Sequence, residues 1–327
     1  MAHEPTLNDV EAAQRTIRGR LHRTPTFSSA TLADRIGARA FLKAELFQRT
    51  GSFKPRGVLT KLASLSAEDR ARGVITISAG NHAQALAYGA ALEGVDCFVV
   101  MWRGANPVKL AATRGYGAEV DLAASGPAEA FERLAELIAS TGRTLVHPFD
   151  DALTIAGQGT VGLELLDDVP DVDAVVVPVG GGGLASGIAT AVKGRRPRTR
   201  VVAVEPEASA ALHEALRAGR AVPVEPRSIA DGLNAPFVGD RCLDVCQRLL
   251  DDSVLVTEAE IEAGMRFLYE RAKLACEPAG AAATAALLAG KVDFRGGETI
   301  ATVVSGGNVA ASTASGILAR DEGGNPS

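Results

Sequence analysis

Short apolar runs alternate with longer amphipathic stretches along most of this chain. The apolar runs contain few polar residues, which is typical of strands whose two faces are both buried. Runs at residues 73–79, 96–101, 174–180 and 200–205 are followed in turn by amphipathic stretches at residues 82–92, 106–117, 184–194 and 211–219. Strand followed by helix, repeated in this way, predicts a doubly wound α/β fold built on parallel sheets.

The predicted strand–helix units fall into two clusters. One runs from about residue 73 to 150 and the other from about 170 to 305, and they join near the polar segment 147–160. We therefore predict two doubly wound open-sheet domains, a small one over residues 73–150 and a large one over residues 1–72 and 151–327. Ligands of such sheets bind beyond the carboxyl ends of the strands, so we expect a cleft between the two domains to hold the ligand.

Composition and charge narrow the class of partner. The chain has 327 residues, of which 46% are hydrophobic and 22% charged, which indicates a folded globular protein rather than a disordered one. Its formal net charge of −5 gives no attraction to nucleic acid or to an anionic membrane, so a small molecule is the expected partner. The polar N-terminal segment and the lack of 18 consecutive apolar residues predict a cytoplasmic protein.

The four cysteines, Cys97, Cys242, Cys246 and Cys276, are scattered along the chain. Cys242 and Cys246 have a spacing that suits one face of a helix better than a zinc site. We expect all four to be reduced thiols, and we predict no metal site from them.

A run of four glycines, Gly180, Gly181, Gly182 and Gly183, follows the apolar run that ends near residue 179. Glycines let the backbone approach a ligand closely, and the helix predicted from about Leu184 offers unpaired N–H groups, so the turn is predicted to bind a phosphate. The run fits neither the GxGxxG dinucleotide pattern nor a P-loop, which disfavours nicotinamide and ATP as ligands. The alternative is a flexible tight turn without a ligand.

A second polar turn, Ser78, Ala79, Gly80, Asn81 and His82, lies between a predicted strand and an alanine-rich helix. Its backbone amides and its serine and asparagine side chains could bind a carboxylate. The alternative is a helix cap, with His82 as a structural histidine.

Two further residues are candidates for chemistry. Ser305 is the first hydroxyl after the apolar run 299–304, although an N-cap would explain it equally well. Lys54 lies in "GSFKPRG" directly before Pro55, which disfavours αR geometry at the lysine and favours a helix that starts at or after the proline. Taken alone, Lys54 would be a solvated surface charge. Together with a phosphate turn and a carboxylate turn, it indicates a pyridoxal phosphate enzyme.

These motifs resemble those of the fold type II pyridoxal phosphate enzymes, and within them the group of threonine and serine dehydratases (ammonia-lyases) and serine racemases. The resemblance covers nearly the whole chain, because the motifs stand in the order that this group uses: "GSFKPRG", "SAGNHAQALA", "HPFDD", "IAGQGT", "VPVGGGGL", "SIADGL", "EPAGA" and "SGGNV".

The resemblance implies a role for each candidate residue. Lys54 would carry the cofactor as a Schiff base with Phe53 packed beside it, and Asn81 would bind the ring hydroxyl. Ser305 would face the pyridine nitrogen and leave it largely unprotonated, which favours loss of a β-substituent over transamination. The cofactor phosphate would bind at Gly180, Gly181, Gly182 and Gly183, and the substrate carboxylate at Ser78, Ala79, Gly80, Asn81 and His82.

The implied reaction is the β-elimination of L-threonine, L-serine or a related β-hydroxy amino acid to a 2-oxo acid and ammonia. An amino-acid racemase of the same fold is the alternative, although serine racemases resemble this chain with a second serine where Ala79 stands. A non-catalytic protein that binds the cofactor or an amino acid is a third possibility.

The resemblance also gives expectations for a cation site, for a regulatory domain and for the oligomeric state. Relatives that bind a cation use a glutamate like Glu205 together with an acidic partner, and residues 209–211 supply none. The short segment after Ser305 predicts that no C-terminal regulatory domain is present. Residues 231–238 are expected to contact the substrate's β-substituent, and family members imply a homodimer or homotetramer.

Overall fold

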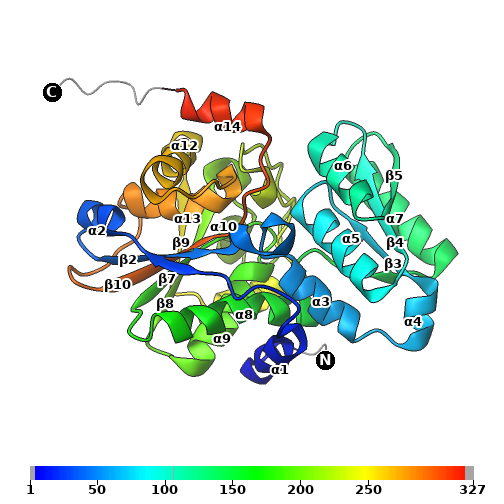
Figure 1. Ribbon diagram of the computed structural model, residues 1–327, viewed down its shortest axis with the longest axis horizontal. Helices are drawn as coiled ribbons and strands as arrows, with labels where there is room; N and C mark the ends of the chain where they lie inside the picture. Colours follow the sequence, from blue (N-terminus) through cyan, green and yellow to red (C-terminus); the bar gives the residue numbers. More distant parts are fainter. Residues whose placement is uncertain (1–3, 106, 321–327) are drawn as a thin grey trace.

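The computed structural model describes residues 4–105 and 107–320 and contains two sheets that lie side by side (Figure 1). The larger sheet has the strand order β1-β2-β10-β7-β8-β9 and the smaller has the order β5-β4-β3-β6. The strands are β1 (Thr26–Ser28), β2 (Arg39–Ala44), β3 (Val74–Ile77), β4 (Cys97–Trp102), β5 (Glu119–Ala124), β6 (Thr144–Leu145), β7 (Ala174–Pro178), β8 (Arg200–Pro206), β9 (Asp252–Val256) and β10 (Thr299–Val304).

Helices precede, connect and cover the strands. The α-helices are α1 (Leu7–Ile17), α2 (Ala30–Ile36), α3 (Pro55–Ala63), α4 (Ala67–Arg72), α5 (Asn81–Glu93), α6 (Pro107–Gly115), α7 (Pro127–Thr141), α8 (Ala152–Asp168), α9 (Gly183–Arg195), α10 (Ala211–Ala218), α11 (Asp240–Leu249), α12 (Glu258–Phe267), α13 (Pro278–Leu288) and α14 (Ala311–Leu318). Short helical turns occur at η1 (Glu45–Phe47), η2 (Arg49–Gly51), η3 (Glu207–Ser209), η4 (Asp231–Leu233) and η5 (Leu268–Ala272).

Strand β7 shows how the apolar runs build the core. Val176 packs into the cluster on the side of α12 and α13, whereas Val175 and Val177 pack into the cluster on the side of α8 and α9 (Figure 1). This alternation follows from the two-residue period of a strand, and it requires apolar residues at every position because helices cover both faces. The predicted doubly wound α/β class is confirmed.

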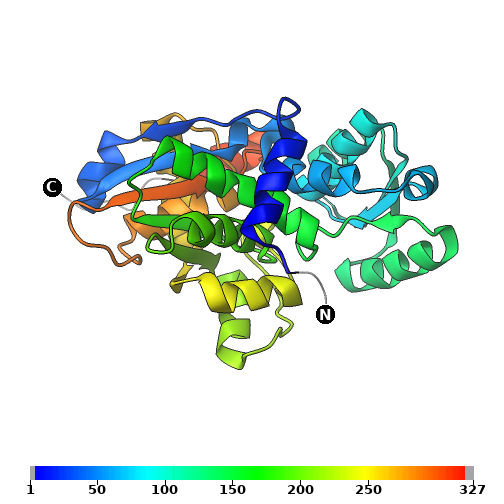
Figure 2. The same cartoon turned by 90° about the horizontal axis from the view of Figure 1, so that it is seen from below.

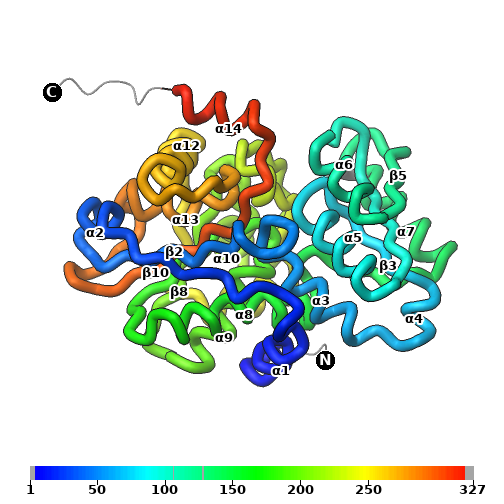
Figure 3. The backbone as a smooth tube through the Cα atoms, viewed as in Figure 1, coloured from blue at the N-terminus to red at the C-terminus, as the bar shows by residue number. Residues whose placement is uncertain are grey.

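The path of the chain links the two sheets twice (Figure 3). The chain leaves the larger sheet after β2, forms the smaller sheet, and returns through α8 to β7. Helix α1 packs against α3 and α8 (Figure 2). The domain limits of 1–72, 73–150 and 151–327 remain a prediction.

Every strand–helix pair expected from the apolar pattern is present, and two features differ from the expectation. Strand β1 pairs antiparallel with β2, so the larger sheet is not parallel throughout. The segment expected to join the two clusters becomes the buried helix α8 from Ala152, because Asp151 accepts hydrogen bonds from the N–H groups of Leu153 and Thr154 and caps it. None of the helices in the described part of the chain is long and apolar enough to cross a membrane.

A buried ion network holds the start of α3 in place. Arg56 is fully buried, and its guanidinium donates to Glu45 Oε2 over 2.8 Å and to Glu164 Oε1 over 2.7 Å. Lys43, also fully buried, donates to Glu164 Oε2 over 2.9 Å. Burial opposes the charge of Arg56, but Glu45 and Glu164 outweigh it and raise the pKa of the guanidinium. The network therefore joins β2, η1, α3 and α8.

Removing the Arg56 side chain leaves two buried carboxylates without their main cation. We expect Arg56→Ala to lower the free energy of unfolding by about 3–5 kcal/mol, measured by urea denaturation followed by circular dichroism. Arg227→Ala is the matched control, because the Arg227 side chain is 78% exposed where it pairs with Glu225, and we expect a change within about 0.5 kcal/mol. A loss below about 1 kcal/mol for Arg56→Ala, the range of an exposed pair, would contradict the assigned role.

Candidate active site

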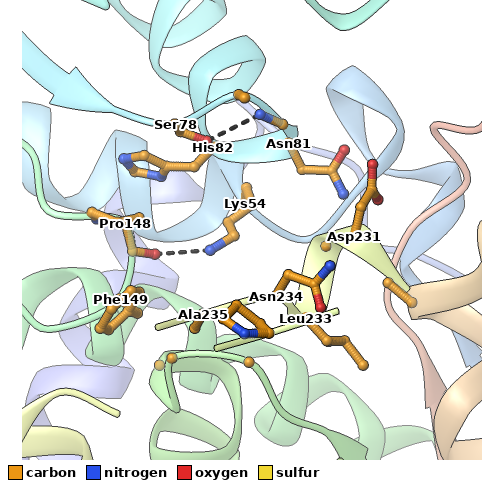
Figure 4. Close-up of a pocket in the computed structure, with 18 of the residues that line it drawn as sticks. Lys54, Ser78, Asn81, His82, Pro148, Phe149, Asp231, Leu233, Asn234 and Ala235 are labelled. Atoms are coloured by element: carbon orange, nitrogen blue, oxygen red, sulfur yellow. Dashed lines mark hydrogen bonds between the residues drawn. The ribbon is translucent and has the colours of Figure 1, made fainter. Parts of the chain in front are cut away.

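A cavity of about 720 Å³ lies at the carboxyl ends of β3, β7 and β10, between the two sheets (Figure 4). The residues predicted from the sequence to carry the chemistry, to bind the cofactor or to bind the substrate carboxylate all line this cavity: Phe53, Lys54, Ser78, Ala79, Gly80, Asn81, His82, Gly180, Gly181, Gly182, Gly183 and Ser305. Residues from four distant parts of the sequence thus meet at one site, which is the arrangement expected for a doubly wound sheet.

The backbone around Lys54 is fastened to the end of β10. Phe53 N–H donates to Ser305 O over 3.2 Å, and Ser52 forms an isolated antiparallel bridge with Gly306. Helix α3 begins at Pro55 as predicted, but Lys54 itself is in the αR region, with φ −54° and ψ −37°, so the expectation that Pro55 keeps it out of αR is wrong. The turn closed by Arg56 N–H on Phe53 O requires this geometry and outweighs the steric preference before proline.

The Lys54 amine points into the cavity. Its Nζ donates to the carbonyl oxygen of Pro148 over 2.8 Å (Figure 4) and lies 5.1 Å from the centre of the Phe53 ring. Burial lowers the pKa of this amine from its usual value to about 8, because the charged form loses its hydration. A substantial fraction is therefore neutral near pH 8 and available as a nucleophile or a base.

The tetraglycine turn leaves no room for side chains. A Cβ atom on Gly181 would lie 2.3 Å from the Phe149 ring, and one on Gly183 would lie 3.0 Å from the backbone of the same residue. Gly182 has φ 97°, a region that L-residues rarely adopt, and a Cβ there would lie 2.7 Å from Cys242 Cβ. Because the turn leads into α9 and lines the cavity, the first-turn N–H groups of this helix are available to an anionic ligand there.

Residues 78–82 lead into helix α5, and the N-cap residue of this helix has no side chain that could cap it. Gly80 is that N-cap, and its N–H donates to Ser78 Oγ over 3.2 Å. Within α5, His82 lies 3.0 Å through Nε2 from Val146 O, which fixes Nε2 as the protonated nitrogen. Burial, followed by the charge of Lys54, lowers the pKa of His82 to about 3, so the ring is neutral at physiological pH.

Ser305 follows directly after β10 and is buried at the cavity wall. Its hydroxyl donates to the carbonyl oxygen of Ala279 over a long 3.5 Å. A neutral hydroxyl, rather than a carboxylate, therefore faces this part of the cavity.

Three polar residues at the cavity had no predicted role. His147 accepts from Asp150 N–H at Nδ1 over 2.8 Å, and burial lowers its pKa to about 4. Glu277 is buried and accepts from Asn81 Nδ2 over 2.6 Å, and burial raises its pKa to about 7. Lys109 reaches the cavity from α6. His147 and Glu277 belong to the motifs "HPFDD" and "EPAGA", but their importance depends on burial, which the motifs do not reveal.

Residues 17–306 match the family described as "Pyridoxal-phosphate dependent enzyme". The chain belongs to this family. Among curated members, it is 44% identical to the L-threonine ammonia-lyase of Thermotoga maritima, over 93% of this chain and 76% of that one. It is 43% identical to the L-threonine dehydratase catabolic TdcB of Staphylococcus aureus, over 97% of this chain and 93% of that one.

Solved structures of the pyridoxal-phosphate-dependent family agree with the fold. Maize serine racemase superposes with a TM-score of 0.91 at 36% identity, covering 95% of this chain and 96% of the other. The threonine deaminase of T.th. gives a TM-score of 0.88 at 42% identity, covering 94% of this chain and 99% of the other. The fold type II assignment and the cofactor pyridoxal phosphate are thereby confirmed.

The cavity suits the family's cofactor chemically. Pyridoxal phosphate presents a dianionic phosphate, an aldehyde and a ring nitrogen. The glycine turn before α9 offers backbone N–H groups, and only glycine fits its contacts with Phe149 and Cys242. The Lys54 amine, with its lowered pKa, is suited to the aldehyde. The donor set therefore fits this group.

Glu205 has a structural role. Its two carboxylate oxygens accept from Leu212 N–H and His213 N–H over 2.8 and 2.7 Å, so the side chain satisfies the first turn of α10. Burial raises its pKa to about 8. Among residues 4–105 and 107–320, no group of three or more His, Cys, Asp or Glu side chains is placed to hold a metal ion.

The lowered pKa of Lys54 gives a pH prediction. In cofactor-free protein, acetylation of Lys54 by acetic anhydride should reach half its maximal rate near pH 8, since the amine is neutral above its pKa. An exposed lysine in a model peptide, the control, needs a pH of about 10.4. Peptide mass spectrometry after brief labelling at a series of pH values measures both. A half-maximum for Lys54 above a pH of about 10 would show that burial does not lower its pKa.

Proposed function

We propose that this protein removes the β-hydroxyl and amino groups of L-threonine, with L-serine or a related β-hydroxy amino acid as a further substrate, and releases a 2-oxo acid and ammonia. The observation that carries the proposal is the half-buried Lys54 amine, of lowered pKa, in the same cavity as a glycine turn suited to a phosphate. Relatives named L-threonine ammonia-lyase and L-threonine dehydratase support the choice of substrate.

The proposed binding roles are those that the family resemblance implies, at residues whose chemical type suits them. We assign the cofactor phosphate to the backbone of Gly180, Gly181, Gly182 and Gly183, the ring hydroxyl to Asn81 and the ring nitrogen to Ser305. The substrate carboxylate is assigned to Ser78, Ala79, Gly80, Asn81 and His82, at the N-terminus of the 13-residue helix α5. Phe53 packs beside the lysine and restricts where the amine can point.

The proposed catalytic residue is Lys54. When bound, pyridoxal phosphate withdraws electrons from the substrate's α-carbon and so makes the α-proton acidic. Lys54 would hold the cofactor through its amine. When that amine is free, it would take the α-proton of the bound substrate. The β-hydroxyl leaves with a proton as water, and hydrolysis of the released enamine takes up water and yields the 2-oxo acid and ammonia.

The side-chain end of the substrate is assigned to the loop around η4. Asp231, Gly232, Leu233, Asn234, Ala235 and Pro236 line the cavity. The rest of the predicted segment, Phe237 and Val238, is not part of this lining. A methyl group, the difference between threonine and serine, is worth only about 1–3 kcal/mol in a pocket, so both amino acids are expected to react.

The decisive experiment measures turnover. Purified protein with pyridoxal phosphate should absorb at roughly 410 to 420 nm and release ammonia and 2-oxobutanoate from L-threonine. Lys54→Ala should lose both the colour and the turnover, because the covalent anchor and the base are the same amine. Lys193→Ala is the matched control and should keep both, since Lys193, in the last turn of α9, pairs with Asp251 and does not line the cavity. Full activity in Lys54→Ala would refute the mechanism.

The same assay separates the second candidate, an amino-acid racemase. The close superposition on maize serine racemase favours this candidate, whereas Ala79 in the cavity lacks a hydroxyl that could act as an acid or base. With L-serine as substrate, chiral chromatography should show pyruvate forming faster than D-serine. The reverse order would favour the racemase, and no reaction with any β-hydroxy amino acid would favour a non-catalytic binding protein.

We also propose that the protein is a cytoplasmic homodimer or homotetramer. Phe27 lies in the edge strand β1 and Phe47 in η1. Their side chains are 42% and 48% exposed and pack edge to face, with 6.3 Å between ring centres. An exposed aromatic pair of this kind is suited to contact with a second copy. The four free, buried cysteines suit a reducing compartment.

Light scattering tests the assembly. We expect the mass of two or four chains for the wild-type protein and a shift toward one chain for the double variant Phe27→Asp and Phe47→Asp, because two desolvated carboxylates oppose the contact. A wild-type mass of one chain at micromolar concentration would contradict the oligomer.

A further inference from the structure

Glu277 lies beneath Asn81 and is the N-cap residue of α13. It is 1% exposed, and its Oε1 accepts from Asn81 Nδ2 over 2.6 Å. Its backbone N–H donates to Gly306 O over 3.1 Å, so the loop after β10 holds the residue as well. None of the roles proposed above uses this carboxylate.

The hydrogen bonds around Asn81 fix the orientation of its amide. Asn308 Nδ2 donates to Asn81 Oδ1 over 2.9 Å and to Thr50 O over 2.7 Å. If the Asn81 amide were flipped, its NH₂ would meet the NH₂ of Asn308 and its oxygen would meet the carboxylate of Glu277. Both contacts are repulsive, so the observed orientation is the only satisfied one. One N–H of Asn81 Nδ2 goes to Glu277 and the second remains for a ligand.

The surrounding backbone is shaped around this pair. A Cβ atom on Gly306 would lie 2.4 Å from Glu277 Oε1 and 3.3 Å from Asn81 Nδ2. Gly232 approaches from the opposite loop, where a Cβ would lie 3.0 Å from Ala279 Cβ and 3.7 Å from Glu277 Oε1. The loop after β10 thus uses glycine at 306 where Glu277 needs space, and the loop of Gly232 closes over the pair by packing tightly on Ala279.

The second oxygen of Glu277 is poorly compensated. Its Oε2 has no hydrogen-bond partner among the described residues. The closest cation is Lys109 Nζ at 3.9 Å, and that ammonium donates instead to Asp231 Oδ2 over 2.6 Å. A buried carboxylate with one unsatisfied oxygen costs stability. A residue that contributed only to stability would be better replaced by an apolar side chain, so the cost indicates a role in the site.

We propose that Glu277 is a positioning residue, which holds the Asn81 amide so that its remaining N–H faces the ring hydroxyl of the cofactor. The proposal rests on the cofactor contact assigned to Asn81 under the proposed function. In this role Glu277 acts through Asn81, and a double-mutant cycle distinguishes that role from a direct contact with a ligand in the cavity that Glu277 lines.

A double-mutant cycle on cofactor binding tests this role. The dissociation constant of pyridoxal phosphate is measured by absorbance titration of cofactor-free protein for the wild type, Glu277→Ala, Asn81→Ala and the double variant. Each single variant should bind roughly 10-fold more weakly, as expected for losing one oriented hydrogen bond. If Glu277 acts through Asn81 alone, the double variant should be no weaker than Asn81→Ala.

Two further variants distinguish the orientation of the Asn81 amide from the effect of the Glu277 charge and from a general effect of losing a carboxylate. Glu277→Gln keeps an oxygen for Asn81 Nδ2 and should bind the cofactor within about threefold of the wild type. Glu225→Ala removes a carboxylate whose side chain is 84% exposed and should change nothing. Thermal melting of each cofactor-free variant checks the fold, and if Glu277→Ala does not fold, Glu277→Asp, which withdraws the carboxylate by one methylene, takes its place in the cycle.

Several outcomes would overturn the role. Additive losses in the double variant would show that Glu277 acts independently of Asn81, and an unchanged dissociation constant in Glu277→Ala would show that it does not act on the cofactor. If Asn81→Ala binds the cofactor normally, the assigned contact and the role of Glu277 both fail, while ammonia release from L-threonine still stands. Conversely, the expected coupling in a protein that releases no ammonia would refute the proposed reaction alone.

Discussion

The ion pair network of Arg56 is the constraint on which the site depends. Arg56 lies two residues after Lys54 and is held by Glu45 and Glu164, so the first turn of α3 cannot shift without separating buried charges. Buried networks of this kind are costly to form and costly to break, and they favour one arrangement over its neighbours. Two sets of interactions therefore fix the backbone that carries Lys54: the ion pairs of Arg56, and the backbone contacts of Ser52 and Phe53 with the end of β10.

Much of the fold and of the site followed from the sequence because the relevant signals are local. Apolar runs mark the buried strands, and a glycine run or a lysine before proline at a strand–helix turn marks a position where chemistry is possible. Gly181 and Gly183 are needed because Phe149 packs against them. The run of glycines in the sequence therefore indicated a close tertiary contact.

The signals that failed were those decided by distant residues. The αR geometry of Lys54 runs against the local preference before proline, and the turn that requires it is held to the distant end of β10 by the hydrogen bond from Phe53 N–H to Ser305 O. Strand β1 is short and lacks an apolar run, so only its pairing with β2 defines it. From the sequence, Glu277 would be an ordinary helix cap. Its burial and its hydrogen bond with Asn81, a residue far away in the sequence, are seen only in the structure.

The glycine turn before α9 also bears on how proteins of this kind diversify. Its proposed contacts with the cofactor phosphate come from the backbone, and its packing against Phe149 and Cys242 excludes side chains. Substitution has almost nothing to adjust there, whereas the lining segment 231–236 contains aspartate, leucine, asparagine and proline, whose side chains can change. The two segments meet through backbone atoms, since a Cβ on Gly180 would lie 3.1 Å from Leu233 Cα. Under the proposed roles, affinity for the phosphate would reside in backbone atoms and preference among substrates in side chains, so substitution could alter the second while the first stays constant.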